Sequence, residues 1–173
     1  PAHGKKAAFI IPGTNFRDDE LMETKRVLEM AGAEIVLASS KRGIIRGMLG
    51  NTVEVNVLLT GFRVSDYDAI VFIGGPGVTE YYQDPAAMSI AAGAASQRKV
   101  LAAISAAPAI LANAGALTGK RATAFMSEKD KLQQGGAVFT GTGVERDGLI
   151  ITCSGPAAAL LFGQAIVDAL AGR

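Results

Sequence analysis

Hydrophobic residues in this chain form short runs that alternate with segments of helical spacing. Four apolar runs have the length of a strand, at residues 7–11, 34–38, 67–73 and 99–104. Between the first two runs, Leu21, Val27 and Leu28 recur at helical spacing behind an acidic first turn, which predicts a helix over 18–30. A strand, a helix and a strand in this order predict parallel strands joined by a right-handed crossover.

The rest of the chain continues this alternation with one interruption. Residues 42–59 contain several glycines, and Val53, Val55 and Val57 alternate with polar residues, which predicts a half-exposed hairpin or edge ribbon. Helices are predicted over 84–98, 108–115, 127–134 and 156–171, and strands over 120–125, 137–140 and 148–152. The chain is therefore predicted to be an α/β protein with a flavodoxin-like, open, mostly parallel sheet that has helices on both faces.

Length and charge narrow the classes of protein. With 173 residues, of which 49% are hydrophobic, the chain suits one buried core and is too short for two typical domains. We expect a lead-in at 1–6, which contains the only histidine, His3, and a single domain over 7–173. The formal net charge of +1, with both signs interleaved, lacks the basic stripe of a nucleic-acid-binding protein.

The lack of a membrane span, a signal peptide and a disulfide in the sequence predicts the cellular compartment. No apolar stretch reaches the roughly 18 residues of a membrane span or has the layout of a signal peptide. The single cysteine, Cys153, excludes an internal disulfide and is interpreted as a small core residue. We therefore expect a cytoplasmic protein with neither nucleic-acid nor membrane partners.

Ser105 directly follows the continuous apolar run that ends at residue 104. Ala103 and Ala107 flank it at two residues on either side, and Pro108 stands in the first turn of the next helix. Small residues at these positions are typical of a nucleophile elbow, where a sharp strand-to-helix turn exposes the central side chain at the carboxyl end of the sheet. The alternative is an ordinary turn with a helix-capping serine.

Two other loops are expected to meet this elbow. Carboxyl ends of neighbouring parallel strands share one crevice, so Glu20, Gly74 and Gly75 should lie near Ser105. The backbone N–H groups of the two glycines and of Ala106 then offer an oxyanion hole. The alternative is that Gly-Gly-Pro-Gly forms only a tight turn between a strand and a helix.

Four motifs in the same order resemble the ThiJ/PfpI superfamily of intracellular proteases and deglycases. They are DAIVFIGGPG from residue 68, AAISAAPAILANAG from 102, LTGKRAT from 117 and LIITCSGP from 149, and the resemblance covers the chain from Ala7 to its last helix. It implies a flavodoxin-like sandwich of the class I glutamine-amidotransferase type, assembled as a homodimer or larger homo-oligomer.

The resemblance carries over only part of the active site. Ser105 stands where the superfamily has its reactive cysteine, and Glu20 matches the glutamate that contacts this nucleophile. Ala106 stands where protease-like members have a histidine, and Phe125 where some glyoxalase-like members have one. Glu80 is a loose match for a glutamate that protease-like members place across a subunit interface.

Serine at position 105 changes the chemistry. The pKa of a hydroxyl, near ~15.7, is roughly seven units above that of a thiol, near ~8.5, so deprotonating the serine costs about 9 kcal/mol more. A helix dipole supplies only about 0.3 to 2 kcal/mol, so a positioned base is required. Lys41 and Lys120 are read as surface cations. Ser105 is a natural loss of activity, a change of role or an engineered replacement of cysteine, and the sequence leaves these three open.

Two hypotheses of different classes remain. The first is a hydrolase- or glyoxalase-like framework acting on small carbonyl adducts, amides or peptides, inactive or impaired with Ser105, in which Glu20 is the acid or base and Gly75 and Ala106 are the oxyanion donors. The second is a stress-related, homo-oligomeric binding or scaffold protein without catalysis. Neither includes a cofactor or metal, because ligand-type residues do not cluster and residues 115–121 are one residue short of a phosphate-binding loop. Tyr81 and Tyr82 are expected to be partly buried, and the alternative is that they line the mouth of the crevice or an oligomer contact.

Overall fold

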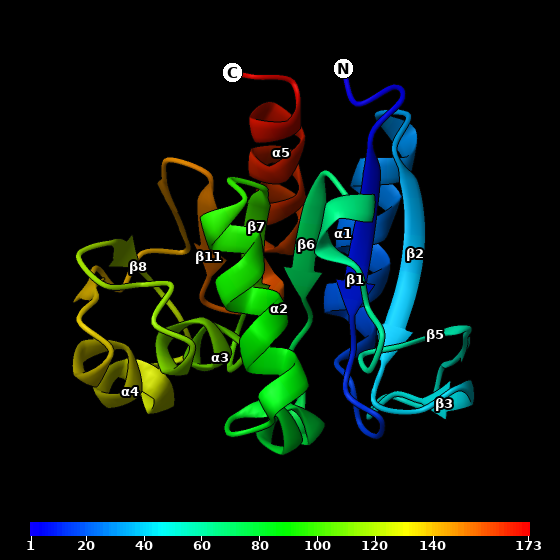
Figure 1. The fold of residues 1–173 in the computed structure, drawn as a ribbon, viewed down its shortest axis with the longest axis horizontal. Coiled ribbons are helices and arrows are strands. Elements are labelled where there is room, and N and C mark those ends of the chain that lie inside the picture. The colour runs from blue at the N-terminus through cyan, green and yellow to red at the C-terminus, as the bar shows by residue number, and fades with distance from the viewer.

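Seven strands form the central sheet of the computed structural model, which describes residues 1–173 (Figure 1). All neighbouring strands are parallel except one antiparallel pair at an edge. The spatial order is β10 (Val144–Asp147), β11 (Ile150–Cys153), β7 (Val100–Ile104), β6 (Ala69–Phe72), β1 (Lys6–Ile10), β2 (Glu34–Ser39) and β5 (Val57–Leu58). This arrangement confirms the predicted open, mostly parallel sheet.

Helices cover both faces of the sheet because its strands are apolar on both sides. Along β1, Ala7 and Phe9 point into one core, while Ala8 and Ile10 point into the other. The first core lies under α1 (Asp18–Met30) and α5 (Ala159–Leu170), and the second under α2 (Pro85–Ser96), α3 (Pro108–Asn113) and α4 (Lys129–Gln134). Short 3₁₀ turns η1 (Val64–Asp66), η2 (Pro76–Tyr81), η3 (Met126–Glu128) and η4 (Pro156–Ala158) lead into several of these elements.

The predicted ribbon over 42–59 is present as a separate antiparallel hairpin of β3 (Gly43–Arg46) and β4 (Thr52–Val55). Its tip is held by Asp18, whose carboxylate accepts hydrogen bonds from the Leu49 N–H and the Asn51 N–H, both at 2.8 Å. A third bond comes from the Asn51 side-chain amide at 2.9 Å. The hairpin is therefore fixed against the start of α1.

The predictions for the last third of the chain were partly wrong. β8 (Arg121–Ala122) and β9 (Val138–Phe139) are shorter than expected and form their own two-stranded sheet. The sequence analysis missed β10, which pairs antiparallel with β11 through a two-residue turn at Gly148, where φ is +64°. Three of the four residues in β10 are charged, as suits an edge strand with one face in water, so no apolar alternation marks it.

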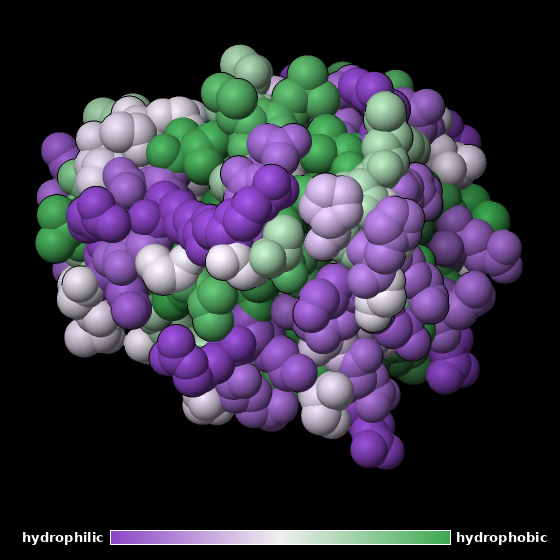
Figure 2. Space-filling model, turned by 90° about the horizontal axis from the view of Figure 1, so that it is seen from above, coloured by the Kyte–Doolittle hydropathy of each residue, from purple (hydrophilic) through white to green (hydrophobic).

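Both chain termini lie at the upper end of the molecule in Figure 1. Ala2 is buried, and its N–H donates to the Ala31 carbonyl at 3.0 Å, so the chain is packed before β1 begins. Figure 2 looks onto this end, where hydrophilic side chains occupy much of the surface. None of the helices combines the length and the apolar character that are needed to cross a membrane.

Candidate active site

Three loops meet where the strand order reverses. The chain proceeds from β1 outward to β2, and later returns to place β6 and then β7 on the other side of β1. The carboxyl ends of these strands point to the lower end of Figure 1. Ligand sites in open α/β sheets lie at such a reversal, so the topology itself marks this crevice.

Ser105 occupies a strained turn between β7 and α3. Its φ is +59°, a left-handed conformation that is uncommon for residues other than glycine. The turn is held on both sides, because the Ser105 N–H donates to the Cys153 carbonyl at 2.9 Å and the Ser105 carbonyl accepts from the Phe125 N–H at 3.0 Å. The residue is buried. The strained strand-to-helix turn is that of a nucleophile elbow, as predicted, but the expected exposure of the side chain is wrong, because Ser105 is 0% exposed.

Glu20 lies beside the Ser105 hydroxyl. The hydroxyl donates to Oε2 of Glu20, and the Gly74 N–H donates to Oε1 at 3.0 Å. Burial raises the pKa of Glu20 to about 7, although the hydrogen bonds from Ser105 and Gly74 oppose this shift. Glu20 therefore changes its protonation state near neutral pH while in contact with the elbow.

The Gly-Gly loop after β6 requires glycine at both positions. A Cβ on Gly74 would lie 2.4 Å from Oγ of Ser105, and one on Gly75 would lie 2.4 Å from the Asn15 carbonyl oxygen. Gly75 also has a φ of +113°. The Gly74 N–H is bound to Glu20, so the prediction that it also serves an oxyanion is wrong. The N–H groups of Gly75 and Ala106 have no hydrogen-bond partner within the protein, and both residues line the pocket, which leaves the two N–H groups free for an oxyanion.

A pocket of about 300 Å³ opens over these groups. The hairpin tip and the loop before α4 contribute to its walls. Besides Glu20, Gly75, Ser105 and Ala106, its lining includes Arg17, Met48, Tyr82, Phe125 and Glu128. All four residues predicted as catalytic thus face one cavity, and their roles in a reaction stay predictions.

Two polar pairs that the sequence did not predict place Tyr82, Glu128 and Arg17 on the pocket lining. Tyr82 and Glu128 are 46 positions apart, and the phenol O–H donates to Oε1 of Glu128 at 2.6 Å. Arg17 pairs with Asp19 through Nε at 2.6 Å. Tyr82 is half-buried as expected, but it faces the pocket. The only sequence signal was its position shortly after the Gly-Gly loop, and nothing local marks Glu128.

Several residues considered from the sequence lie elsewhere. His3 packs against Gly32 beyond the amino end of β1 and cannot serve the elbow. Glu80 is exposed and accepts a hydrogen bond from the Gly13 N–H at 2.8 Å. The expected partial burial is wrong for Tyr81, which is 1% exposed and whose hydroxyl donates to the Ile11 carbonyl at 2.7 Å. Cys153 is buried as predicted, and burial raises the pKa of its thiol to about 11.

The chemistry that this site supports follows from the groups present. In the predicted roles, a nucleophile at position 105 would attack a carbonyl carbon, the Gly75 and Ala106 N–H groups would bind the developing oxyanion, and Glu20 would accept or donate a proton. Phe125 lines the pocket at the position where a histidine was weighed, and no histidine lies in the pocket. No group of three or more His, Cys, Asp or Glu side chains is placed to hold a metal ion.

Comparison with known proteins agrees with this geometry. The chain is 33% identical over 140 residues to a deglycase of Pyrococcus abyssi, covering 81% of this chain and 84% of that protein. It is 26% identical over 168 residues to a glutathione-independent glyoxalase of Caenorhabditis elegans, covering 97% and 90%. The crystal structure of a ThiJ/PfpI domain protein from Brachyspira murdochii superposes with a TM-score of 0.93 at 27% identity, covering 97% of each chain. The profile of the DJ-1/PfpI family matches residues 5–169, and the chain belongs to that family.

Proposed function

We propose that the chain retains the substrate pocket of a DJ-1/PfpI enzyme for small carbonyl adducts, amides or peptides, and that Ser105 leaves the reaction strongly impaired. The observation that carries this proposal is the Ser105–Glu20 pair. The Ser105 hydroxyl sits in the strained elbow with Glu20 as its hydrogen-bond acceptor, and no second base reaches it. The relatives named as deglycase and glyoxalase support the reaction class.

The pKa values decide how much the serine matters. Glu20 has a pKa of about 7, whereas a serine hydroxyl is near ~15.7, a gap of roughly nine units or about 12 kcal/mol for full proton transfer. For a thiol near ~8.5 the gap is about 1.5 units, or about 2 kcal/mol. The same carboxyl can therefore activate cysteine at this position and is a poor base for serine.

The test replaces the nucleophile. Ser105→Cys and Ser105→Ala are compared with the unaltered chain on methylglyoxal loss, an aryl ester and a fluorogenic peptide. We expect Ser105→Cys alone to be active on at least one substrate, by on the order of 100-fold or more over the unaltered chain. Ser96→Cys is the matched control, because it adds an exposed thiol at the end of α2 and so measures the unspecific reaction of thiols with methylglyoxal.

Two other results would contradict the proposal. Turnover by the unaltered chain that Ser105→Ala abolishes would mean that an unrecognised base activates the serine. Inert behaviour of all three folded variants would instead favour the alternative function, a binding or scaffold protein without catalysis.

We further propose that the chain self-associates. Large apolar side chains are exposed on α1 and α5, with Met30 at 78%, Leu160 at 50% and Leu161 at 69%. Met30 and Leu160 also line an open groove of about 400 Å³ between α1 and α5. Contiguous exposed apolar surface of this kind is typical of an interface.

A further inference from the structure

Tyr82 and Glu128 form one wall of the pocket. Tyr82 follows η2, and Glu128 ends η3 just before α4. Glu128 is only 7% exposed, although it is a glutamate near the surface. Its two carboxylate oxygens accept hydrogen bonds from the Tyr82 O–H at 2.6 Å and from the Ser127 hydroxyl at 2.8 Å. The pair is therefore oriented before any ligand binds.

This wall presents acceptors. The single phenol hydrogen of Tyr82 is committed to Glu128, so the phenol oxygen offers its lone pairs to the pocket. The Ala106 carbonyl oxygen lies 3.5 Å from that same phenol oxygen, too far to compete for the hydrogen with the contact at 2.6 Å. A phenol oxygen, a carbonyl oxygen and a carboxylate thus lie close together, and a ligand group that suits all three is an N–H donor with positive charge.

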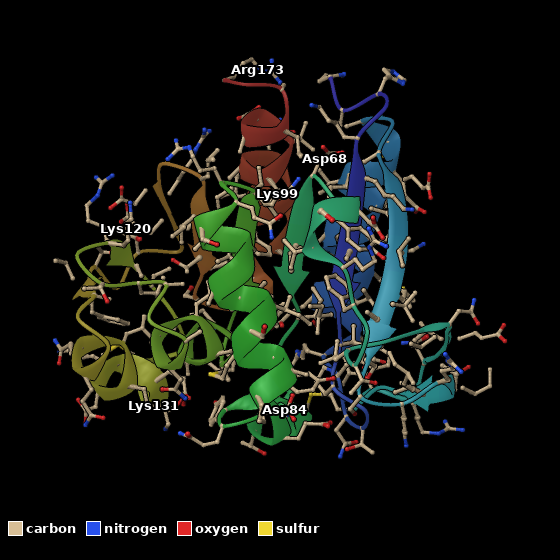
Figure 3. The ribbon with its side chains drawn as sticks, viewed as in Figure 1. Asp68, Asp84, Lys99, Lys120, Lys131 and Arg173 are labelled. Carbon is tan, nitrogen blue, oxygen red and sulfur yellow. The ribbon has the colours of Figure 1, made fainter.

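The cationic side chain of Lys131 leaves this wall available to a ligand. Nζ of Lys131 is 3.7 Å from Oε1 of Glu128 and 5.4 Å from the centre of the Tyr82 ring. However, the Lys131 side chain is 43% exposed and does not line the pocket. In Figure 3 it lies on α4 at the same end of the molecule as Asp84. The pair is exposed only at its Lys131 end, since the Glu128 side chain is 9% exposed, and a ligand in the pocket would share the Glu128 carboxylate with Lys131.

The elbow presents donors. The free N–H groups of Gly75 and Ala106 suit a carbonyl oxygen next to position 105. Arg17 adds a guanidinium on this lining, although Asp19 holds it through two of its nitrogens. The pocket is thus polarised, with donors beside Ser105 and acceptors at the Tyr82–Glu128 wall.

From this polarity we propose that Tyr82 and Glu128 are specificity-determining residues that select carbonyl compounds carrying an ammonium or similar cationic nitrogen. The inference rests on the proposed function, because it assigns the carbonyl to the elbow. Glu128 binds the cationic nitrogen directly, and the Tyr82 oxygen accepts a second hydrogen bond from it. Apolar substrates of the same size lose these contacts.

The experiment measures binding to the chain as it is, with Ser105 in place, so that it does not depend on turnover. The probes are 4-aminobutanamide and pentanamide, which have the same shape and differ by an ammonium group in place of a methyl group. Titrations followed by backbone amide NMR shifts give the ratio of the two dissociation constants. We expect the ammonium compound to bind about tenfold more tightly, as a single charge-assisted hydrogen bond permits.

Variants of Glu128 and Tyr82 test whether these two residues cause the preference for the ammonium compound. Glu128→Gln keeps an acceptor for the Tyr82 O–H but loses the charge, and it should reduce the ratio to about one, while Tyr82→Phe should reduce it in part. Glu34→Gln is the matched control, because this exposed glutamate at the start of β2 lies outside the pocket, and the ratio should not change. Thermal unfolding verifies that each variant is folded.

Three outcomes would overturn the inference: equal binding of both amides, a preference that survives in Glu128→Gln, or no binding of either probe at the pocket. These outcomes are separable from failure of the proposed function, which is measured as turnover by Ser105→Cys. An active cysteine variant without an ammonium preference would leave the proposed function intact and remove this inference alone.

Discussion

Ser105 and Glu20 show how one residue's environment sets the behaviour of its neighbour. The elbow holds Ser105 at a φ of +59°, and the hydroxyl that projects from it donates to a carboxyl that burial has made reluctant to ionise. Strain of this kind costs on the order of 1 to 3 kcal/mol and persists only where the surroundings determine it. Here the backbone bonds to Cys153 and Phe125 do so.

The raised pKa of Glu20 predicts a pH-dependent stability. Between its ordinary value of 4.5 and about 7, the folded state holds more protons on Glu20 than the unfolded state does. The free energy of unfolding should therefore fall as pH rises through this window, by up to about 3 kcal/mol, and level off above it. Urea unfolding at about pH 5 and about pH 8 measures this difference.

Glu20→Gln separates this contribution from others. The variant keeps a hydrogen-bonding side chain but cannot ionise, so its stability should change much less between the two pH values. Asp18 and Asp19 have lowered pKa values and act in the opposite sense, but below the window. An equal decline in both proteins would show that other groups cause the pH dependence.

At the scale of elements, the β3–β4 hairpin depends on one buried carboxylate. Asp18 lies at the start of α1 and is 1% exposed. Burial favours the neutral form of Asp18, but the hydrogen bonds from Leu49 and Asn51 outweigh it and lower the pKa. The hairpin tip that these bonds hold includes Met48, which lines the pocket. Asp18 thus connects a helix start to the shape of the site.

Asp18→Ala should release the hairpin tip. The N–H groups of Leu49 and Asn51 lose their acceptor, which should cost about 2 to 4 kcal/mol of stability and speed amide hydrogen exchange at these two residues. Glu23→Ala is the control, because this glutamate on the same helix forms only an exposed pair with Arg26. Unchanged exchange at the tip would mean that backbone hydrogen bonds hold the loop without Asp18, such as the bond from the Met48 N–H to the Phe16 carbonyl at 2.9 Å.

For the whole molecule, the exposed apolar residues on α1 and α5 predict self-association. Sedimentation at several concentrations should show a dimer or larger species, and Leu160→Lys should shift the distribution toward the monomer by placing a charge in the groove that Met30 and Leu160 line. Val138→Lys is the control, since Val138 is 58% exposed on β9, away from these helices. A monomer at all concentrations would contradict the proposed self-association.

The sequence by itself determined the layers and the place of the site. Burial is encoded locally, so continuous apolar runs marked the strands that are covered on both faces, and a serine between alanines marked the elbow after β7. Once the strands were known to be parallel, Glu20 and Gly75 followed, because carboxyl ends of neighbouring strands share one crevice.

Only the tertiary structure decided which polar groups meet. The Tyr82–Glu128 pair joins positions far apart in the chain, and Asp18, expected only as an acid in a first helical turn, bonds to residues 31 and 33 positions away. The charged edge strand β10 was missed for a related reason, since it is stabilised by pairing with β11 and not by burial of its own side chains. A hydrogen bond tolerates a variation of only a few tenths of an ångström in its donor–acceptor distance. Side-chain packing sets that distance, and the periodicity of the sequence does not encode it.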